Sequence, residues 1–296
     1  MDSRDNKSSE IYTIKALTNM HVGSGDINFG VIDNMVQRDV ITKFPIINGS
    51  SLKGALRDYF SREIREDKEF VEAVFGGGAT EQDSKGANNN SGDYKFFEAH
   101  LLALPVRSME RPYYLATCPL ILKELAEYIK WFKGKKETAE ALYTQVEDLE
   151  LKSGGVLLST TVNNQEKISV EDIIIQGKNI GDSESIATAI KSLFNVEELV
   201  ILTDETFEKQ FASNLPVLAR NHLVNRKSEN LWYEEIVPRE TLFYMGICKQ
   251  CNGRDSSVDF QEMEKYLLEN PIQIGANASI GYGYTKFSIL GECNNG

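Results

Sequence analysis

The feature that most restricts the fold of this chain is the irregular order of its strand-like and helix-like segments. Residues 11–17 alternate in polarity and are rich in β-branched side chains, which predicts a strand. A helix is predicted over 51–72, and two further strands over 242–249 and 284–290. Because these segments follow no regular strand–helix–strand repeat, the sequence favours an α+β domain with an antiparallel sheet and large insertions.

Two segments stand out from a single predicted domain that spans residues 1–296. Residues 76–95 are rich in Gly, Asn and Asp, a composition that predicts a flexible insertion. Residues 214–240 show a strand–turn–strand pattern with charged side chains at its tip, which predicts a β-hairpin.

The net charge of −12 argues against a free-standing nucleic-acid binder, since such proteins usually carry a basic surface. Nucleic-acid binding then requires a local concentration of positive charge, or neighbouring subunits that supply part of the groove. The chain has no run of about 18 apolar residues, so no membrane span is expected. The first ten residues lack the apolar core of a signal peptide, and we therefore expect a cytoplasmic protein.

A compact basic site is predicted at the start of the helix over 51–72. Ser50 or Ser51 can cap the helix, whose free amide groups favour an anion such as phosphate. Lys53 and Arg57 are four residues apart and lie on one helix face. Gly54 inside the helix suggests close approach of a ligand or of another backbone. The alternative is an ordinary amphipathic helix with two solvated cations.

Two loops carry further candidate residues. Residues 21–38 hold His21, Asp33 and Arg38, and an acid beside an RNA backbone could deprotonate a 2′-hydroxyl or bind a divalent cation. Residues 271–284 contain three glycines whose backbone amides could cradle a phosphate, although this segment fits neither a Walker A loop nor a dinucleotide-binding loop. A single loop aspartate is more often a turn residue that bonds its own backbone.

The predicted hairpin combines cations with aromatic side chains. Arg220, His222 and Arg226 lie near Trp232 and Tyr233, a combination that suits binding of an RNA backbone and stacking of bases. The alternative is a surface hairpin whose aromatic side chains pack on the core.

Taken together and in this order, these segments resemble the RAMP superfamily, and most closely the multi-copy backbone subunit of the type III-B (Cmr) CRISPR effector complex. The resemblance spans nearly the whole chain. It lies in the His-x-Gly-Ser-Gly loop at 21–25, GVIDNMVQR at 30–38, PIINGSSLKGALR at 45–57, LPVRS at 104–108 with Thr-Cys-Pro at 117–119, and LWYEEIVPRETLF at 231–243 with the loop at 274–284. The loop reads Ile-Gly-Ala-Asn where Ile-Gly-Gly-Asn is common in the family.

The resemblance implies a ferredoxin-like, RRM-related palm with an antiparallel sheet, helical insertions and a protruding thumb hairpin at about 216–237. It also implies the partners, which are a CRISPR guide RNA, a target RNA, copies of the chain itself in a helical filament, and the other subunits of the effector complex. The implied activity is endonucleolytic cleavage of target RNA at regular intervals, with Mg²⁺ or Mn²⁺ as cofactor.

The resemblance also implies roles for individual residues. Asp33 matches the catalytic aspartate and would bind the metal, and Glu235 matches a second family acid that we expect to be catalytic. The residues expected to contact RNA are His21, Ser24, Arg38, Ser51, Lys53, Arg57, Arg220, His222, Arg226, Gly275 and Asn277.

The sequence leaves three other functions open. The first is the equivalent backbone subunit of the type III-A (Csm) complex, although the chain length and the Leu-Trp-Tyr-Glu-Glu segment favour type III-B. The second is a catalytically silent scaffold that binds only guide RNA and its neighbours. The third, a guide-processing endonuclease that acts alone, is disfavoured by the acidic charge, since a solitary enzyme should attract its polyanionic substrate.

Overall fold

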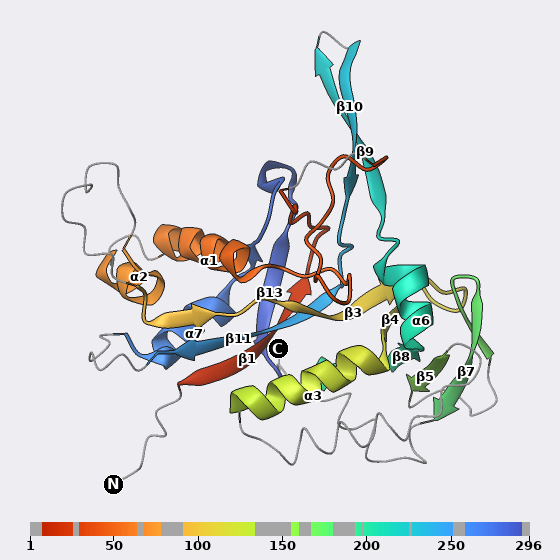
Figure 1. The fold of residues 1–296 in the computed structure, drawn as a ribbon, viewed down its shortest axis with the longest axis horizontal. Helices are drawn as coiled ribbons and strands as arrows, with labels where there is room; N and C mark the ends of the chain where they lie inside the picture. The colour runs from red at the N-terminus through yellow and green to blue at the C-terminus, as the bar shows by residue number, and fades with distance from the viewer. Residues whose placement is uncertain are drawn as a thin grey trace.

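The fold is built on one large sheet, seen in a computed structural model that describes residues 8–25, 30–63, 68–77, 91–133, 155–159, 167–179, 193–196, 198–224, 227–250 and 258–291. The strand order in this sheet is β12-β13-β1-β11-β3-β4-β8-β5-β7-β6, and β2 also pairs with β11. Figure 1 shows the sheet crossing the molecule, with helices on its faces and a separate hairpin standing away from it.

The palm of the molecule is the antiparallel part of this sheet. It contains β1 (Ser9–Ala16), β2 (Tyr94–Phe96), β3 (His100–Val106), β11 (Leu242–Lys249), β12 (Ile272–Gln273) and β13 (Tyr284–Ile289). β1 lies between β11 and β13, with Tyr12 opposite Met245 on one side and Ile289 on the other. This part of the structure confirms the predicted α+β fold with antiparallel pairing.

Side chains alternate along β1 and therefore point to both faces of the palm, and a helix covers each face. On one face, the Tyr12 hydroxyl donates a hydrogen bond of 2.7 Å to Glu264 of α7 (Phe260–Glu269). On the other face, the Ser9 hydroxyl donates to the carbonyl of Phe132 in α3 (Pro119–Lys133). β1 therefore lies between two helical layers at its first half, and its interior side chains are fully buried.

The helix predicted over 51–72 is two helices, α1 (Gly49–Glu63) and α2 (Lys68–Phe75). α1 begins before Ser50 and Ser51, so neither serine occupies the position ahead of the helix that a cap requires. Phe60 of α1 is 1% exposed and packs against Phe70 and Phe75 of α2. Burial of such a ring stabilises the helix pair by about 1.5–3 kcal/mol.

A second part of the sheet extends beyond β3. It contains β4 (Tyr114–Thr117), β5 (Gly155–Ser159), β6 (Lys167–Val170), β7 (Ile173–Asn179) and β8 (Glu198–Leu202), followed by α6 (Asp204–Phe207) and the π-helix η2 (Glu208–Ala212). Two pairs here, β4–β8 and β5–β7, are parallel, whereas the palm is antiparallel. No helix among the described residues is long and apolar enough to cross a membrane.

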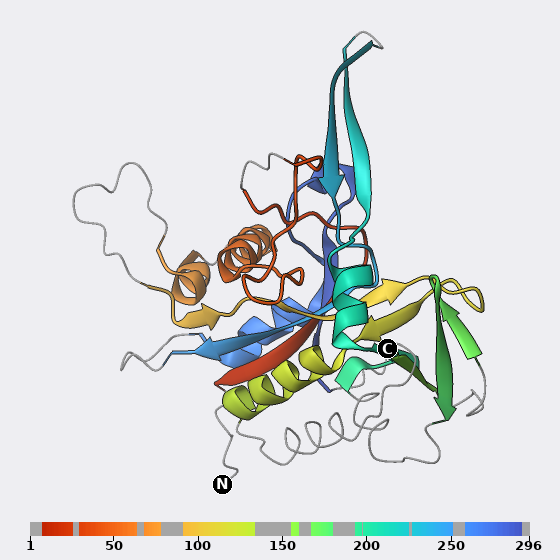
Figure 2. The same ribbon diagram turned by 45° about the vertical axis from the view of Figure 1, so that its right-hand side comes forward.

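The hairpin consists of β9 (Val217–Val224) and β10 (Lys227–Glu235), which form a two-stranded sheet of their own. Figures 1 and 2 both show it projecting far from the sheet. Its free end is exposed along both strands, whereas Glu234 and Glu235 at its root are buried. A two-stranded ribbon without a core of its own is held mainly by its root.

The flexible insertion expected over 76–95 falls mostly outside the described residues, but its last residues are part of the fold. Residues 78–90 lie outside the described residues, but Ser91 forms a bridge with Gly76. Tyr94 then begins β2, is 2% exposed and pairs with Lys249 of β11. Burial of this aromatic ring fixes a segment whose composition suggested flexibility.

Candidate functional site

A cleft of about 780 Å³ opens at the root of the hairpin. Segments far apart in the sequence form its walls, namely the loops at 21–25 and 33–35, the root of β10, and the glycine-rich loop with the short 3₁₀ helix η3 (Ala278–Ile280). Four residues predicted from the sequence line it, which are His21, Ser24, Asp33 and Asn277. The fold therefore brings the two candidate loops and the hairpin into one site.

Asp33 lies exposed at the mouth of this cleft and is fixed to the root of the hairpin. Its backbone amide donates to the carbonyl of Tyr233 at 3.1 Å, and its carboxylate Oδ2 accepts from the Tyr233 amide at 2.7 Å. The other carboxylate oxygen, Oδ1, has no hydrogen bond to a described residue. Asp33 thus presents one free oxygen to the cleft in a fixed orientation.

His21 forms the inner wall of the cleft and is only 5% exposed. Its Nδ1 lies 2.7 Å from the carbonyl oxygen of Glu235. Because a carbonyl oxygen only accepts, Nδ1 must carry the proton that it donates, which leaves Nε2 as the other exchangeable position. A side chain at Gly23 would lie 3.1 Å from Nε2, so the glycine keeps this ring edge uncovered.

Arg38 and Glu235 form a largely buried ion pair. Their side chains are 14% and 2% exposed, and Arg38 Nη2 donates to Glu235 Oε1. Arg38 Nη1 also donates to the carbonyls of Lys43 and Ala212, and Glu235 Oε2 accepts from the Val36 amide. These partners favour a structural role for both side chains, while the expected RNA contact of Arg38 and the expected catalytic role of Glu235 stay predictions.

Glu234, the neighbour of Glu235 in sequence, faces the cleft instead. Its Oε1 accepts from Arg220 Nη2 and from Asn277 Nδ2, both at 2.9 Å. The Arg220 guanidinium also lies over the Tyr282 ring, 4.7 Å from its centroid. Arg220 and Asn277 were expected to contact RNA, but in this structure both tie the hairpin to the glycine-rich loop through Glu234.

The glycine-rich loop lies against the backbone of His21, and its sequence follows from that contact. Gly275 has φ +90°, and a Cβ at this position would lie 2.4 Å from the His21 carbonyl oxygen. That oxygen accepts a hydrogen bond of 2.8 Å from the amide of Ala276. Residue 276 is the position at which the resembled family commonly has glycine. Gly275 therefore serves close packing of two cleft walls, and an RNA contact of Gly275 stays a prediction.

Gln37 connects the cleft to the start of α1. Its side-chain amide donates to the Gly23 carbonyl at 3.1 Å and to the Ser51 hydroxyl at 2.9 Å. Its Oε1 accepts from the Asn48 amide at 2.7 Å. One buried glutamine thus sets the position of the first loop relative to the helix, and the Ser51 hydroxyl accepts one of its hydrogen bonds.

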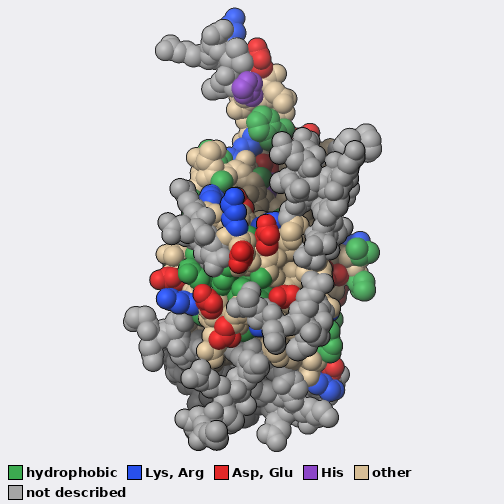
Figure 3. All heavy atoms as spheres, turned by 90° about the vertical axis from the view of Figure 1, so that its left-hand side faces the viewer, with side chains coloured by type: hydrophobic (Ala, Val, Ile, Leu, Met, Phe, Trp, Pro, Cys, Tyr) green, Lys and Arg blue, Asp and Glu red, His purple; other side chains and the backbone are tan. Residues whose placement is uncertain are grey.

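Lys53 and Arg57 are the cations of α1 that remain available. Neither has a hydrogen bond or ion pair to another described residue, in contrast to Arg62, which pairs with Asp58. A Cβ added at Gly54 would meet nothing within 4 Å, so the helix surface beside the two cations is open at this position. Figure 3 views the side of the molecule on which α1 lies, where Lys and Arg side chains gather below the hairpin beside acidic ones.

The outer part of the hairpin carries the remaining predicted RNA contacts. His222 of β9 is exposed and pairs with Asn230 of β10. Arg226 lies outside the described residues. Trp232 lines the cleft, so part of its side chain is accessible there and is not packed on the core.

The acidic groups of the cleft offer a divalent cation one free ligand. No group of three His, Cys, Asp or Glu side chains suited to a metal occurs among the residues that the structure describes. Glu234 accepts hydrogen bonds from Arg220 and Asn277, whereas Oδ1 of Asp33 bonds to no described residue. One carboxylate fits Mg²⁺ or Mn²⁺ if water and substrate phosphate complete the coordination, as is usual for Mg²⁺.

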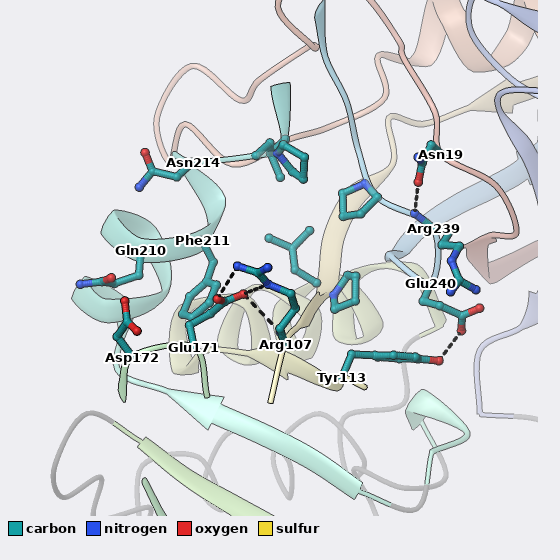
Figure 4. A pocket seen from close by; sticks show the side chains of 15 residues that line it. Asn19, Arg107, Tyr113, Glu171, Asp172, Gln210, Phe211, Asn214, Arg239 and Glu240 are labelled. Atoms are coloured by element: carbon teal, nitrogen blue, oxygen red, sulfur yellow. Dashed lines mark hydrogen bonds and ion pairs between the residues drawn. The ribbon is translucent and has the colours of Figure 1, made fainter. Parts of the chain in front are cut away.

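A different pocket of about 730 Å³ lies between β3, the turn at 171–172 and η2, with Pro216 and Pro238 beside the hairpin root also lining it. Figure 4 shows Arg107 facing Glu171, which accepts two hydrogen bonds at 3.0 and 2.9 Å, and Tyr113 bonded to Glu240. None of the sequence-predicted site residues lines this pocket. The candidate site is therefore the cleft with Asp33.

Comparison with known proteins agrees with this geometry. The family model of the RAMP superfamily matches residues 13–286. The CRISPR system Cmr endoribonuclease Cmr4 of Pyrococcus furiosus is 30% identical over 95% of both chains. A crystal structure of oligomeric Cmr4 from the same organism superposes with a TM-score of 0.69 at 26% identity, covering 95% of this chain and 97% of that one.

A cryo-EM structure of the type III-B Cmr-beta complex in its apo state gives a TM-score of 0.75 at 21% identity, again over 95% of this chain and 97% of the other, which supports the fold alone. The family model, the full-length relative and the shared architecture lead to one assignment. This chain belongs to the RAMP superfamily.

Proposed function

We propose that this chain is the RNA-binding backbone subunit of a type III-B CRISPR effector complex, and that it cuts target RNA in the cleft at the root of the hairpin. The observation that carries the proposal is the placement of Asp33, which is exposed, fixed to the hairpin and left with one carboxylate oxygen that bonds to no described residue. The relative from Pyrococcus furiosus, which is named an endoribonuclease, aligns along 95% of the chain.

The chemistry begins with the geometry of the RNA backbone. A target strand that crosses the hairpin is bent at its root, where a 2′-hydroxyl can align with the adjacent phosphate for in-line attack. Holding reacting atoms in such a geometry can contribute about 7–11 kcal/mol to lowering the barrier. Asp33 Oδ1 then orients this hydroxyl and accepts its proton, and Oδ2 remains bonded to the Tyr233 amide.

His21 supplies a second proton-exchanging group in the same cleft. The Glu235 carbonyl holds its Nδ1 proton at 2.7 Å, so the ring turns its Nε2 edge toward the space beside Gly23. From there it can contact the RNA backbone or exchange a proton with the leaving oxygen. Arg38 and Glu235 act on this chemistry only through position, because they hold the loop and the β10 root together.

As an alternative to accepting the proton, Asp33 Oδ1 would bind a divalent cation together with oxygens of the RNA. When bound, Mg²⁺ or Mn²⁺ would offset negative charge that develops at the phosphate. Asp33 contributes one carboxylate oxygen to such an ion, and the protein cleft contributes no second free carboxylate among its described residues.

The guide RNA would run along the exposed face of α1. Lys53 and Arg57 lie there without a hydrogen bond or ion pair to another described residue, beside the open surface at Gly54. Two such cations supply a local positive site within a chain whose net charge is −12. Copies of the chain arranged along the guide would repeat this site, and the other subunits of the effector complex and a cytoplasmic location complete the proposal.

The test is cleavage of target RNA by the reconstituted complex, with wild-type chain or Asp33→Ala, in Mg²⁺, Mn²⁺ or EDTA. We expect cuts at regular spacing that disappear in the variant, while guide binding and assembly persist. Loss of the cuts in EDTA would support the cation. Cleavage that is unchanged by the substitution would move the chemistry to another residue, and bound but uncut target with wild type would favour a silent scaffold.

A further inference from the structure

Gln37 lies where the segment that carries Asp33 meets two other parts of the site. Its backbone amide donates to the Val22 carbonyl at 2.9 Å, and its own carbonyl accepts from the Ile46 amide at 3.0 Å. The first bond holds the segment to the loop at 21–25, and the second holds it to the residues that lead into α1. A residue in this position can act on the cleft and on the helix together.

The side chain of Gln37 makes the same connection a second time and is only 8% exposed. Its two amide protons go to the Gly23 carbonyl and the Ser51 hydroxyl, and its oxygen accepts from the Asn48 amide. A flipped amide would set two donors against each other at Asn48 and two acceptors at Gly23, so only one orientation satisfies all three bonds. The two donations therefore depend on a carboxamide at this position.

At the helix end of this connection, Gln37 controls the direction of the Ser51 hydroxyl. The hydroxyl oxygen accepts from Gln37 Nε2 at 2.9 Å, and its own proton has no acceptor among the described residues. A hydroxyl that accepts from a fixed donor directs its proton away from that donor. Gly54, three residues further along α1, neighbours Ser51 on the helix, and its surface is open. The Ser51 proton is therefore left for an acceptor outside the protein, such as a phosphate oxygen.

At the cleft end, Gln37 holds the wall beside His21. Gly23 lines the cleft, forms a bridge with Val36, and would bring a Cβ to 3.1 Å from His21 Nε2. The bond of 3.1 Å from Gln37 to the Gly23 carbonyl fixes this glycine against the segment that also carries Asp33. Loss of that bond would let the wall with His21 move relative to the carboxylate.

We propose that Gln37 is a positioning residue that serves both RNA strands. It orients the Ser51 hydroxyl toward a phosphate of the guide, and it fixes the Gly23 wall of the cleft for cleavage of the target. This role rests on the proposed function, which places the guide at α1 and the target in the cleft, and it names the side chain that connects the two sites. Because Gln37 is buried, it acts through Ser51 and Gly23 by separate routes.

The route through Ser51 is tested by filter binding of a synthetic guide RNA to the full chain at one salt concentration. Gln37→Met, which is unbranched like glutamine but donates nothing, and Ser51→Ala should each weaken binding by about tenfold, because a hydrogen bond to a charged phosphate is lost. The double variant should stay within about threefold of the weaker single variant, because both changes remove one and the same contact. Independent losses that multiply to about 100-fold in the double variant would overturn the link.

The route through Gly23 is tested by single-turnover cleavage in the reconstituted complex, with guide and target both saturating. Gln37→Met should lower the rate constant by about 100-fold, the cost of displacing a cleft wall by about 1 Å, whereas Ser51→Ala should stay within about threefold of wild type. Gln37→Glu keeps the acceptor for the Asn48 amide but has no proton to donate, so an equal loss assigns the effect to the donations. Gln261→Met on the exposed surface of α7 is the matched control.

The outcomes separate the role of Gln37 from the proposed function. Wild-type guide affinity and cleavage in Gln37→Met would overturn the role and leave the proposed function standing. Equal loss of cleavage in Ser51→Ala would also overturn it, because the effect would then pass through the guide alone. A wild-type complex that binds target without cutting contradicts the proposed function, and the guide-binding cycle still decides the role of Gln37. Melting curves of every variant set an assay temperature at which all of them are folded.

Discussion

The mouth of the cleft and the interior directly behind it contain the same types of charged residue in opposite states. Asp33 at the mouth is exposed, with one oxygen bonded and one free. Glu235 behind it is 2% exposed, and both of its oxygens are occupied by Arg38 and Val36. Asp33 bonds to Tyr233 of β10 and Glu235 belongs to the same strand. Only Asp33 has a carboxylate oxygen without a described partner.

The difference shows that burial and partners decide the role of a charged residue in this site. A buried ion pair such as Arg38–Glu235 fixes the geometry of the loop and the hairpin, because either charge would be costly if left alone. A group without such a buried pair, such as the exposed Asp33 or the half-buried Arg57, costs less to the fold and is available for RNA. Substitutions in the two regions should therefore separate stability from activity.

The largest effect on stability is expected from Arg38→Ala. This change leaves the carboxylate of Glu235 buried without its partner, which should lower the free energy of unfolding by about 3–5 kcal/mol. Urea titration followed by circular dichroism measures the loss. An unfolding midpoint equal to wild type would contradict the structural role of the pair.

A smaller effect is expected from Gly275→Ala in the wall of the cleft. Left-handed backbone costs an alanine about 1–2 kcal/mol, and displacement of the His21 carbonyl adds about 1–3 kcal/mol. Gly281→Ala is the matched control, because φ is +80° there and a Cβ would meet nothing within 4 Å. Thermal melts of both variants test this, and equal losses would show that the contact with His21 adds no constraint.

The smallest effect on stability is expected from Arg57→Ala, which should change the free energy of unfolding by less than about 0.5 kcal/mol. RNA affinity should fall, and the slope of log K against log salt should decrease by about 1, because one phosphate contact is lost. Arg62→Ala is the control, since Arg62 already pairs with Asp58 on the same helix. Filter binding at several salt concentrations makes the comparison, and an unchanged slope for Arg57→Ala would remove α1 from the RNA path.

The parts of the fold that depend on local patterns could be predicted from the sequence. The alternation over 11–17 and the charged tip between two apolar runs predicted β1 and the hairpin, and the structure contains both. The order of β4, β8, β5 and β7, with two parallel pairs, could not be predicted, because it depends on contacts between distant segments. Composition also failed at Tyr94, whose burial orders the end of the expected insertion.

The candidate site divides in the same way. The sequence predicted that Asp33, His21 and Asn277 belong to functional loops, and the fold brings them to one cleft. It could not show that Arg38 meets a carboxylate 197 residues away, and so assigned that arginine to RNA. Glu234 was missed because the sequence alone does not distinguish it from its neighbour Glu235. Side chains alternate between the two faces of a strand, so a predicted strand here already implied that only one of the two glutamates could face the cleft.

The most direct test of the account compares Asp33→Asn with Glu235→Gln in the same reconstituted complex, with urea unfolding of each chain measured in parallel. The account predicts that Asp33→Asn keeps wild-type stability, because its amide oxygen can still accept from Tyr233, and loses at least about 100-fold in cleavage. Glu235→Gln should lose stability, with cleavage falling only as far as the folded fraction falls. Wild-type cleavage by Asp33→Asn, or a fully stable Glu235→Gln that no longer cuts, would contradict the account.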